Sequence, residues 1–332
     1  MQKKNSTSSI VEAGIIAGIV IVLMLMNAYM PFLSIIGVAI FPIPLTLLVI
    51  RHNTGVAIGS LVASAIVGSM LIDPYNAISI LVLFGPIGII LGYCIKTKKS
   101  SLYSVILQGI AAIIGYVILI TITAYIMFDT NIVGLINMSI ENIKKSAQMA
   151  VDMYTAMGIS MENNTMINSI NSLTAEIMLM NIVPLLVILG FIVGYANYMI
   201  TRQILKKFRI EIQPFKSFRN WYVDNRIIAL LIILACIGIL ITNINQNIGQ
   251  FIIISTLMLL STILMIIGMS TAIYYLNKFQ VFKSFGVIFI ILTMVSLQYV
   301  YVILGLTESI MDTRNLDPNS IKKALMKKIT KK

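Results

Sequence analysis

Residues 102–128 read LYSVILQGIAAIIGYVILITITAYIMF, a stretch without a single charged side chain. An α-helix needs about 20 apolar residues to cross the roughly 30 Å hydrocarbon layer of a bilayer. Inside that layer a helix satisfies its own backbone hydrogen bonds within one segment. The stretch therefore predicts a membrane-spanning helix.

The same pattern recurs along the chain and predicts an all-α, polytopic transmembrane helical bundle of about nine spans. The 332 residues are 58% hydrophobic and only 11% charged, whereas a soluble domain carries about 25% charged residues. A β-barrel would show alternating strands of about ten residues, which this sequence lacks. The predicted spans cover residues 9–30, 32–50, 54–72, 77–95, 102–128, 172–202, 226–242, 248–277 and 284–306.

The net charge of +12 is distributed in short basic clusters between the apolar runs. This distribution argues against a nucleic-acid partner and follows the rule that Lys and Arg stay on the cytoplasmic side. A cytoplasmic N-terminus places Arg51 and the clusters at 96–99 and 202–219 inside. A ninth span then places the lysine-rich tail outside, and an eight-span arrangement places it inside. We expect nine spans, with eight as the alternative.

Residues 129–170 form a polar loop between two spans, on the predicted outer side. Apolar residues recur within it at steps of three and four, from Ile136 and Ile140 to Met157. This spacing predicts one amphipathic helix that lies flat on the membrane or caps the bundle. Glu141 and Lys145 stand at the spacing of a helical ion pair.

The long basic segment before residue 226 divides the chain. We expect a six-span module over 1–209, a cytoplasmic basic linker over 210–225, a three-span extension over 226–306 and a polar tail over 307–332.

Local features of the first two spans suggest specific roles. Pro42 and Pro44 remove backbone donors and predict a helix break, which a membrane tolerates where protein or a cavity covers the freed carbonyls. Glu12 follows Ser9 at capping-box spacing, and His52 is interpreted as an interfacial side chain.

Polar residues near the outer ends of spans form a candidate ligand site: Asn27, Tyr29, Glu176 and Asn181. Such residues are costly in a membrane and are functional candidates, although interfacial positions explain Glu176 equally simply. Ala13, Gly14 and Ala17 form a small-residue face that suits a partner helix, with internal packing as the alternative.

The chain shows no signature of an enzyme or of a metal or cofactor site. It lacks a phosphate-binding G-x-x-x-x-G-K-[ST] loop, and its single histidine and two separated cysteines suit no usual zinc site. We therefore expect neither catalysis nor a cofactor.

The chain resembles the YybS-like family of bacterial membrane proteins, for which no function is assigned. The motifs that carry the resemblance are Glu12-Ala13-Gly14, Phe41-Pro42-Ile43-Pro44 with Arg51-His52, Gly85-Pro86-Ile87-Gly88 with Gly92-Tyr93, Pro214-Phe215 with Phe218-Arg219 and Trp221, and Gly305-Leu306 with Asp312 and Arg314. The resemblance implies the bacterial cell membrane as the location.

Residues 1–209 also resemble, more distantly, the substrate-binding S components of energy-coupling-factor vitamin transporters. That resemblance implies a small-molecule pocket facing outward. It also implies docking through Ala13 and Ala17 onto a coupling subunit that works with ATPases. The other expectation is a non-transporting scaffold or regulator that binds membrane proteins. The oligomeric state is left open.

Overall fold

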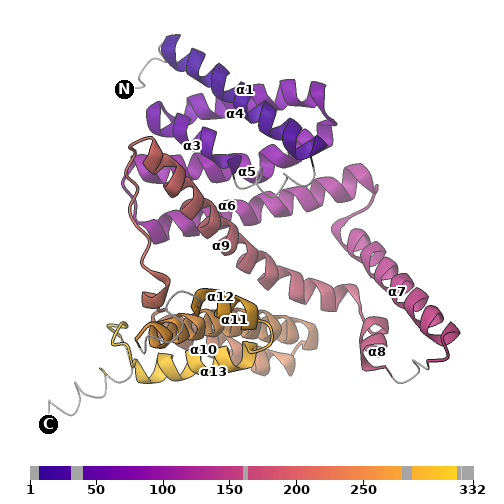
Figure 1. Ribbon diagram of the computed structural model, residues 1–332. Coiled ribbons are helices and arrows are strands. Elements are labelled where there is room, and N and C mark those ends of the chain that lie inside the picture. Colours follow the sequence, from indigo (N-terminus) through magenta and orange to yellow (C-terminus); the bar gives the residue numbers. More distant parts are fainter. Residues whose placement is uncertain (1–6, 31–39, 160–163, 279–285, 320–322, 324–332) are drawn as a thin grey trace. The chain divides into compact units, whose positions relative to one another are not determined.

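The computed structural model describes residues 7–30, 40–159, 164–278, 286–319 and 323, and every regular element in this part of the chain is a helix. The chain forms two compact units (Figure 1). The first unit is Met1–Ala175 with Leu185–Phe215, and the second is Glu176–Pro184 with Lys216–Lys332.

Seven of the described helices are long and apolar enough to cross a membrane. They correspond to seven of the nine predicted spans and confirm a polytopic helical bundle. The seven are α1 (Thr7–Tyr29), α4 (Thr54–Leu71), α5 (Pro74–Lys96), α6 with its π-helical end (Ser101–Met127), α9 (Ala175–Lys207), α10 (Asn225–Thr242) and α11 (Gln246–Lys278).

The other two predicted spans differ from the expectation. In place of the second span, Ile40 is helical, Phe41 forms a turn, and the short helix α3 (Pro42–Arg51) follows. Residues 31–39 of that prediction lie outside the described residues. In place of the ninth, the chain forms α12 (Gly286–Thr293) and α13 (Gln298–Met311), separated by turns.

Apolar side chains of α1, α3, α4, α5 and α6 form the core of the first unit. Val20 and Met24 of α1 are fully buried in it. Ser60 and Ser64 of α4 donate hydrogen bonds to main-chain carbonyls of α1, at 3.0 and 3.4 Å. These bonds satisfy hydroxyls that would otherwise be buried without partners, and they hold α4 against α1.

Glycines allow the helices of this unit to approach closely. A Cβ on Gly88 of α5 would overlap the carbonyl oxygen of Pro42, where α3 begins. A Cβ on Gly190 of α9 would come within 2.7 Å of the carbonyl oxygen of Gly109 in α6. Small residues at helix crossings stabilise helix pairs in membranes, because close packing, rather than the hydrophobic effect, drives helix association there.

The loop after α6 contains α7 (Ile132–Ala156) and the short helix α8 (Thr165–Asn171). Helix α7 buries only Ile136 and Ile140, as its amphipathic pattern predicts. The Lys145 ammonium lies 2.7 Å from the Glu141 carboxylate, so the expected ion pair is confirmed. A side-chain hydrogen bond from Lys145 and its charge lower the pKa of Glu141.

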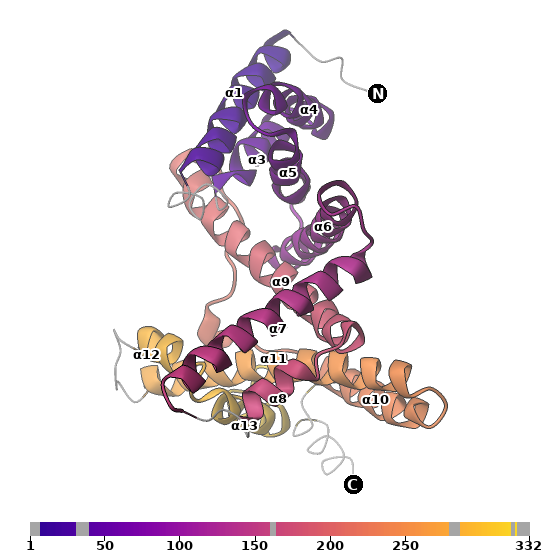
Figure 2. The same ribbon diagram turned by 90° about the vertical axis from the view of Figure 1, so that its right-hand side faces the viewer.

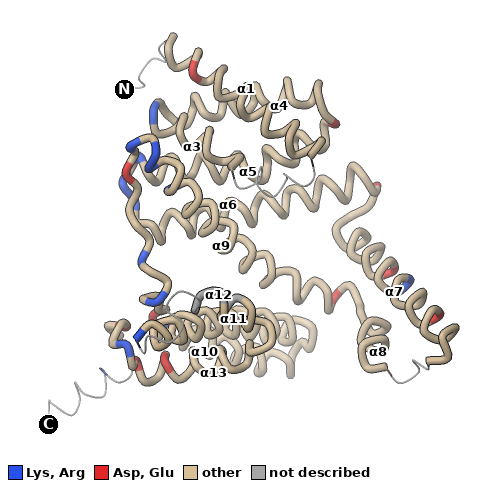
Figure 3. Tube along the Cα trace, viewed as in Figure 1, with Lys and Arg blue, Asp and Glu red and all other residues tan. Residues whose placement is uncertain are grey.

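Lys and Arg positions of the first unit gather where α3, α5 and α9 end (Figure 3). We call this side of the membrane the basic side. Helices α1, α4 and α6 lead away from it, and α7 and α8 lie in the loop on the opposite side.

In the second unit, α10 and α11 form an antiparallel pair, visible from two directions (Figures 1 and 2). Gly238 of α10 packs against Ile252 and Ile253 of α11. Helix α13 crosses α11 with its backbone in contact: a Cβ on Gly268 would overlap the carbonyl of Tyr301, and a Cβ on Gly305 would overlap that of Leu264.

The tail returns to the side of the membrane on which α10 begins. The Asp317 carboxylate accepts the backbone N–H of Asn225 at 3.1 Å, and the Asn319 amide donates to Asp224 at 2.7 Å. Segment 208–224, between α9 and α10, contains no helix long and apolar enough to span a membrane. The return of the tail to the side on which α10 begins agrees with the eight-span alternative.

The pair α12 and α13 does not form one continuous span. Helix α11 ends in Lys278 on the side of the second unit where α10 begins, and α13 also ends there. Helix α12 has eight residues, about 12 Å at 1.5 Å per residue, which cannot cross a roughly 30 Å layer. We therefore interpret α12 and α13 as a re-entrant pair, which enters and leaves the bilayer by the same face.

Candidate functional site: a buried ion-pair cluster in the second unit

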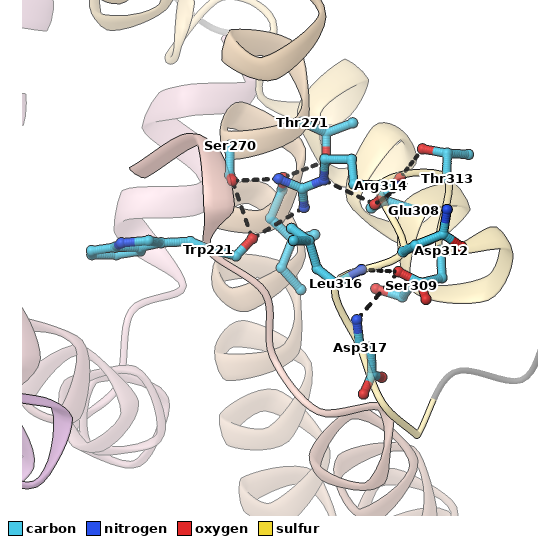
Figure 4. A network of polar contacts seen from close by, with 12 residues as sticks. Trp221, Ser270, Thr271, Glu308, Ser309, Asp312, Thr313, Arg314, Leu316 and Asp317 are labelled. Atoms are coloured by element: carbon cyan, nitrogen blue, oxygen red, sulfur yellow. Dashed lines mark hydrogen bonds and ion pairs between the residues drawn. The ribbon is translucent and has the colours of Figure 1, made fainter. Parts of the chain in front are cut away.

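The richest polar network among the described residues surrounds Arg314, just beyond the end of α13. Two features of the local sequence position it. The Gly268–Gly305 crossing brings α13 onto α11, and Asp312 ends α13 in the left-handed conformation with φ 43°. This turn reverses the chain and points Arg314 back toward α11 (Figure 4).

The Arg314 guanidinium is almost fully enclosed, with 1% of its side chain exposed. Its Nε donates to Glu308 at 2.9 Å, and Nη1 donates to Ser270 Oγ at 2.7 Å. The carbonyls of Arg219 (2.9 Å, from Nη1) and Trp221 (3.1 Å, from Nη2) accept further bonds. A buried charge is tolerated only when it is paired and hydrogen-bonded, and this one is both.

The Glu308 carboxylate is equally well satisfied. Its first oxygen also accepts the backbone N–H of Arg314 at 3.2 Å, and its second accepts the hydroxyl of Thr313. The Tyr275 hydroxyl donates to Thr313 at 2.8 Å. Ser270 in turn donates to the carbonyls of Phe218 and Trp221, at 2.7 and 3.1 Å. The cluster therefore fastens loop 218–221 to α11 and α13.

A second layer of carboxylates stabilises the turn that carries Arg314. Asp312 accepts the backbone N–H groups of Leu316 and Asp317, at 2.8 and 3.3 Å, and lies 3.3 Å from the Lys323 ammonium. At the start of α10, a hydrogen bond from the backbone N–H of Arg226 is the main cause that lowers the pKa of Asp224.

Chemically, this cluster positions main chain rather than performing a reaction. Its carboxylates and guanidinium are engaged with one another and with the backbone. No group of three or more His, Cys, Asp or Glu residues in the described chain is arranged to hold a metal ion.

The first unit has a smaller ionic cluster on the basic side. Arg51 donates to one oxygen of Glu12 at 2.6 Å, and His52 Nε2 lies 2.6 Å from the other. Lys96 donates to the carbonyls of Val49 (3.3 Å) and His52. The interpretations of Glu12 as a capping acid and of His52 as an interfacial side chain missed this contact, which joins α1 to α3 and α5.

Buried amides join α6 to α9. The Asn197 amide donates to Gln108 Oε1 at 2.6 Å, Gln108 donates to the Ser104 carbonyl at 3.0 Å, and Thr201 donates to Asn197 at 3.3 Å. Gln108 and Thr201 are completely buried. Neither amide was predicted to be functional, although a Gln or Asn inside an apolar run is a visible signal in the sequence.

The four predicted ligand residues fall in both units. Tyr29 is 69% exposed at the end of α1 and donates to the Leu71 carbonyl at 3.3 Å; Asn27 lies half-buried beside it. Glu176 and Asn181 are exposed in the first turns of α9, which belong to the second unit, and the Asn181 amide donates to its own helix at Ile177. A pocket formed by all four stays a prediction.

The predicted partner face of α1 is split. Ala17 is buried, and the carbonyls of Ala13 and Ala17 accept the hydroxyls of α4. Gly14 and Gly18 are exposed, and a Cβ on either would meet no atom within 4 Å. Internal packing thus accounts for Ala17, and the open part of the face is Gly14 with Gly18.

The prolines stand at the start of a helix. Pro42 is the first residue of α3 and Pro44 the third, positions whose N–H groups have no partner within the helix in any case. The Thr46 hydroxyl lies 2.9 Å from the carbonyl oxygens of Pro42, one turn earlier in α3, and of Gly88 in α5, and so joins the two helices.

These features define a polytopic helical membrane protein with interrupted spans. The chain belongs to the family described as "Predicted membrane protein (DUF2232)", whose match covers residues 18–309. It is also similar to the "Uncharacterized protein YybS" of Bacillus subtilis (strain 168), with 25% identity over 304 residues, 87% of this chain and 91% of that protein. No solved structure matches the chain.

Proposed function

We propose that this protein is a substrate-binding module of a small-molecule, vitamin-like transporter in the bacterial cell membrane, with its N-terminus in the cytoplasm. The observation that supports this proposal is the interrupted span at Phe41 and Pro42. Helix α3 begins at the depth of Gly88, eight residues or about 12 Å from the Lys96 end of α5. The interruption therefore lies within the hydrocarbon layer.

An interruption at that depth has a functional rationale. Broken helices expose backbone groups inside the membrane, and such groups are stable only when they contact protein or line a cavity. Transporters use the ends of half-helices to contact substrate near the midplane. The re-entrant pair α12 and α13 gives the second unit an interrupted segment as well.

The layout of the first unit supports the same proposal. Helices α7 and α8 lie in the loop before α9, on the side opposite the basic side, where an S-component-like module would receive its substrate. By chain topology, Asn27 and Tyr29 at the end of α1 and Glu176 at the start of α9 lie on that side as well. We propose Asn27, Tyr29, Glu176 and Asn181 as contacts for the substrate.

The test is purification of the full chain in a mild detergent, followed by mass spectrometry of extracted small molecules and of co-purifying proteins. Transport predicts one stoichiometric metabolite, or a coupling subunit with its ATPases. The variant Asn27→Ala should lose the metabolite, and the exposed α7 variant Gln148→Ala should retain it. Recovery of neither metabolite nor coupling subunit, with an unrelated membrane enzyme instead, would exclude this proposal.

The alternative is a non-transporting scaffold, and the exposed Gly14 and Gly18 on α1 favour it. Two glycines one helical turn apart let another helix approach closely in a membrane. Under this alternative, Gly14→Leu with Gly18→Leu abolishes recovery of a partner, whereas Gly59→Leu on α4, also exposed and uncrowded, leaves it unchanged.

A further inference from the structure

A pocket of about 470 Å³ lies in the second unit beside the ion-pair cluster. Loop 217–219, the last turns of α11, α12 and the turn after α12 contribute its walls. Its lining residues are Ser217, Phe218, Arg219, Met269, Ile273, Asn277, Ile290 and Met294.

The lining residues are of two kinds: the apolar ones, which we call the floor, and the polar ones, which we call the rim. Ile273 and Ile290 are buried at 8% and 3% exposure, and two methionines extend the same surface. The rim consists of Ser217, Arg219 and Asn277. Methionine side chains adapt to irregular apolar ligands, and guanidinium groups match phosphate oxygens with paired donors.

The charge at the rim is available to a ligand. Arg219 is exposed, and no acidic side chain of the described residues forms an ion pair with its guanidinium. Lys216 lies near Arg219 in sequence, Lys278 follows the lining residue Asn277, and both lysines are likewise exposed. An anion at this rim therefore meets a positive potential at the membrane surface.

The wall that carries Arg219 is held in place by the cluster. The carbonyl of Arg219 accepts Arg314 Nη1, and the preceding carbonyl, of Phe218, accepts Ser270 Oγ. Only the main chain of Arg219 takes part, so its side chain stays free of this structural task. Such a fixed wall lowers the entropy lost on binding.

We propose that this pocket binds an anionic glycerophospholipid from the leaflet on the basic side, with the phosphate at Arg219 and one acyl chain on the floor. Phosphate is the recognised group, which free inorganic phosphate shares. The apolar floor favours the lipid, because burying hydrocarbon on it adds about 25 cal/mol per Å² that a free ion cannot gain. This inference goes beyond the proposed transport function and is independent of it.

The experiment is native mass spectrometry of the full chain in detergent, titrated with phosphatidylglycerol, phosphatidylcholine or inorganic phosphate. Phosphatidylglycerol should bind preferentially, and Arg219→Gln should weaken its binding about tenfold, the effect of losing a charge-assisted hydrogen bond worth about 1.4 kcal/mol or more. Arg209→Gln, an exposed basic residue outside the pocket, is the matched control. Met294→Trp, which fills the floor, should also reduce binding.

Two results would overturn the inference. One is equal loss of phosphatidylglycerol binding in Arg219→Gln and Arg209→Gln, which indicates diffuse attraction to the basic surface. The other is competition by inorganic phosphate with no effect of Met294→Trp, which indicates an ion site without a lipid chain. Unchanged thermal unfolding of Arg219→Gln is expected, because the hydrogen bond to its carbonyl is retained.

Discussion

The carboxylate of Asp317, beyond the last helix, accepts the backbone N–H of Asn225 at the start of α10, across 92 positions of sequence. This bond places the end of the described chain beside the segment that precedes α10. Both must then lie on one face of the membrane.

Cysteine labelling in intact cells tests this topology. In a Cys94→Ala, Cys236→Ser background, cysteines at Pro318 and Ser217 should both resist a membrane-impermeant maleimide. A cysteine at Asn245, between α10 and α11, should react. Labelling at Pro318 with protection at Ser217 would contradict the re-entrant arrangement and restore a ninth span.

The crossing of α11 and α13 predicts a sharp response to one added methyl group. Gly268→Ala and Gly305→Ala each place a Cβ into a backbone carbonyl, so the helices must separate. Overpacking of this kind costs roughly 1–3 kcal/mol or more. Thermal unfolding in detergent should shift downward for both variants and remain unchanged for the exposed Gly14→Ala. A wild-type transition in Gly268→Ala would refute the close crossing.

The two ionic clusters should differ in their contribution to stability. Glu308→Gln leaves the enclosed Arg314 without its counter-charge, which costs about 3–5 kcal/mol for buried pairs. Glu12→Gln removes a pair whose Arg51 side chain is 50% exposed, where the typical effect is about 0–1 kcal/mol. In chemical denaturation, Glu308→Gln should therefore lower the free energy of unfolding more than Glu12→Gln does.

A double variant distinguishes the loss of the Glu308–Arg314 attraction from the cost of leaving the Arg314 charge buried and unpaired. Glu308→Gln combined with Arg314→Met should recover part of the stability that Glu308→Gln loses, because no buried charge remains unpaired. Additive losses in the double variant would argue against a direct ion pair in the folded protein.

Asp224 predicts a modest dependence of stability on pH. Its pKa is lowered in the folded state, chiefly by the backbone N–H of Arg226, with Asn319 also donating. The stabilisation is therefore complete above the usual aspartate range and is lost as the pH falls through the lowered folded-state value. The stability difference between wild type and Asp224→Asn should shrink on acidification. A stability difference that grows on acidification would contradict a lowered pKa of Asp224 in the folded state.

The candidate site was visible in the sequence only as separate pieces. Trp221, Asp312 and Arg314 belong to the motifs that carry the family resemblance, yet nothing in their spacing predicts that Arg314 pairs with Glu308 and Ser270. That pairing needs the left-handed turn at Asp312 and the close glycine crossing. Likewise Glu12 stands 39 positions before Arg51, and only the packing of α1 against α3 joins them.

The sequence by itself determined a helical membrane protein, because uncharged runs of spanning length have no other stable state in a bilayer. It also determined the amphipathic α7 and the break near Pro42, which are local consequences of periodicity and of proline. Tertiary structure alone decided that residues 286–306 do not form one continuous helix, that Ala17 packs inward, and that residues 317–319 lie beside the start of α10. These outcomes depend on contacts between distant segments, where a missing Cβ or one buried carboxylate determines how closely two helices approach.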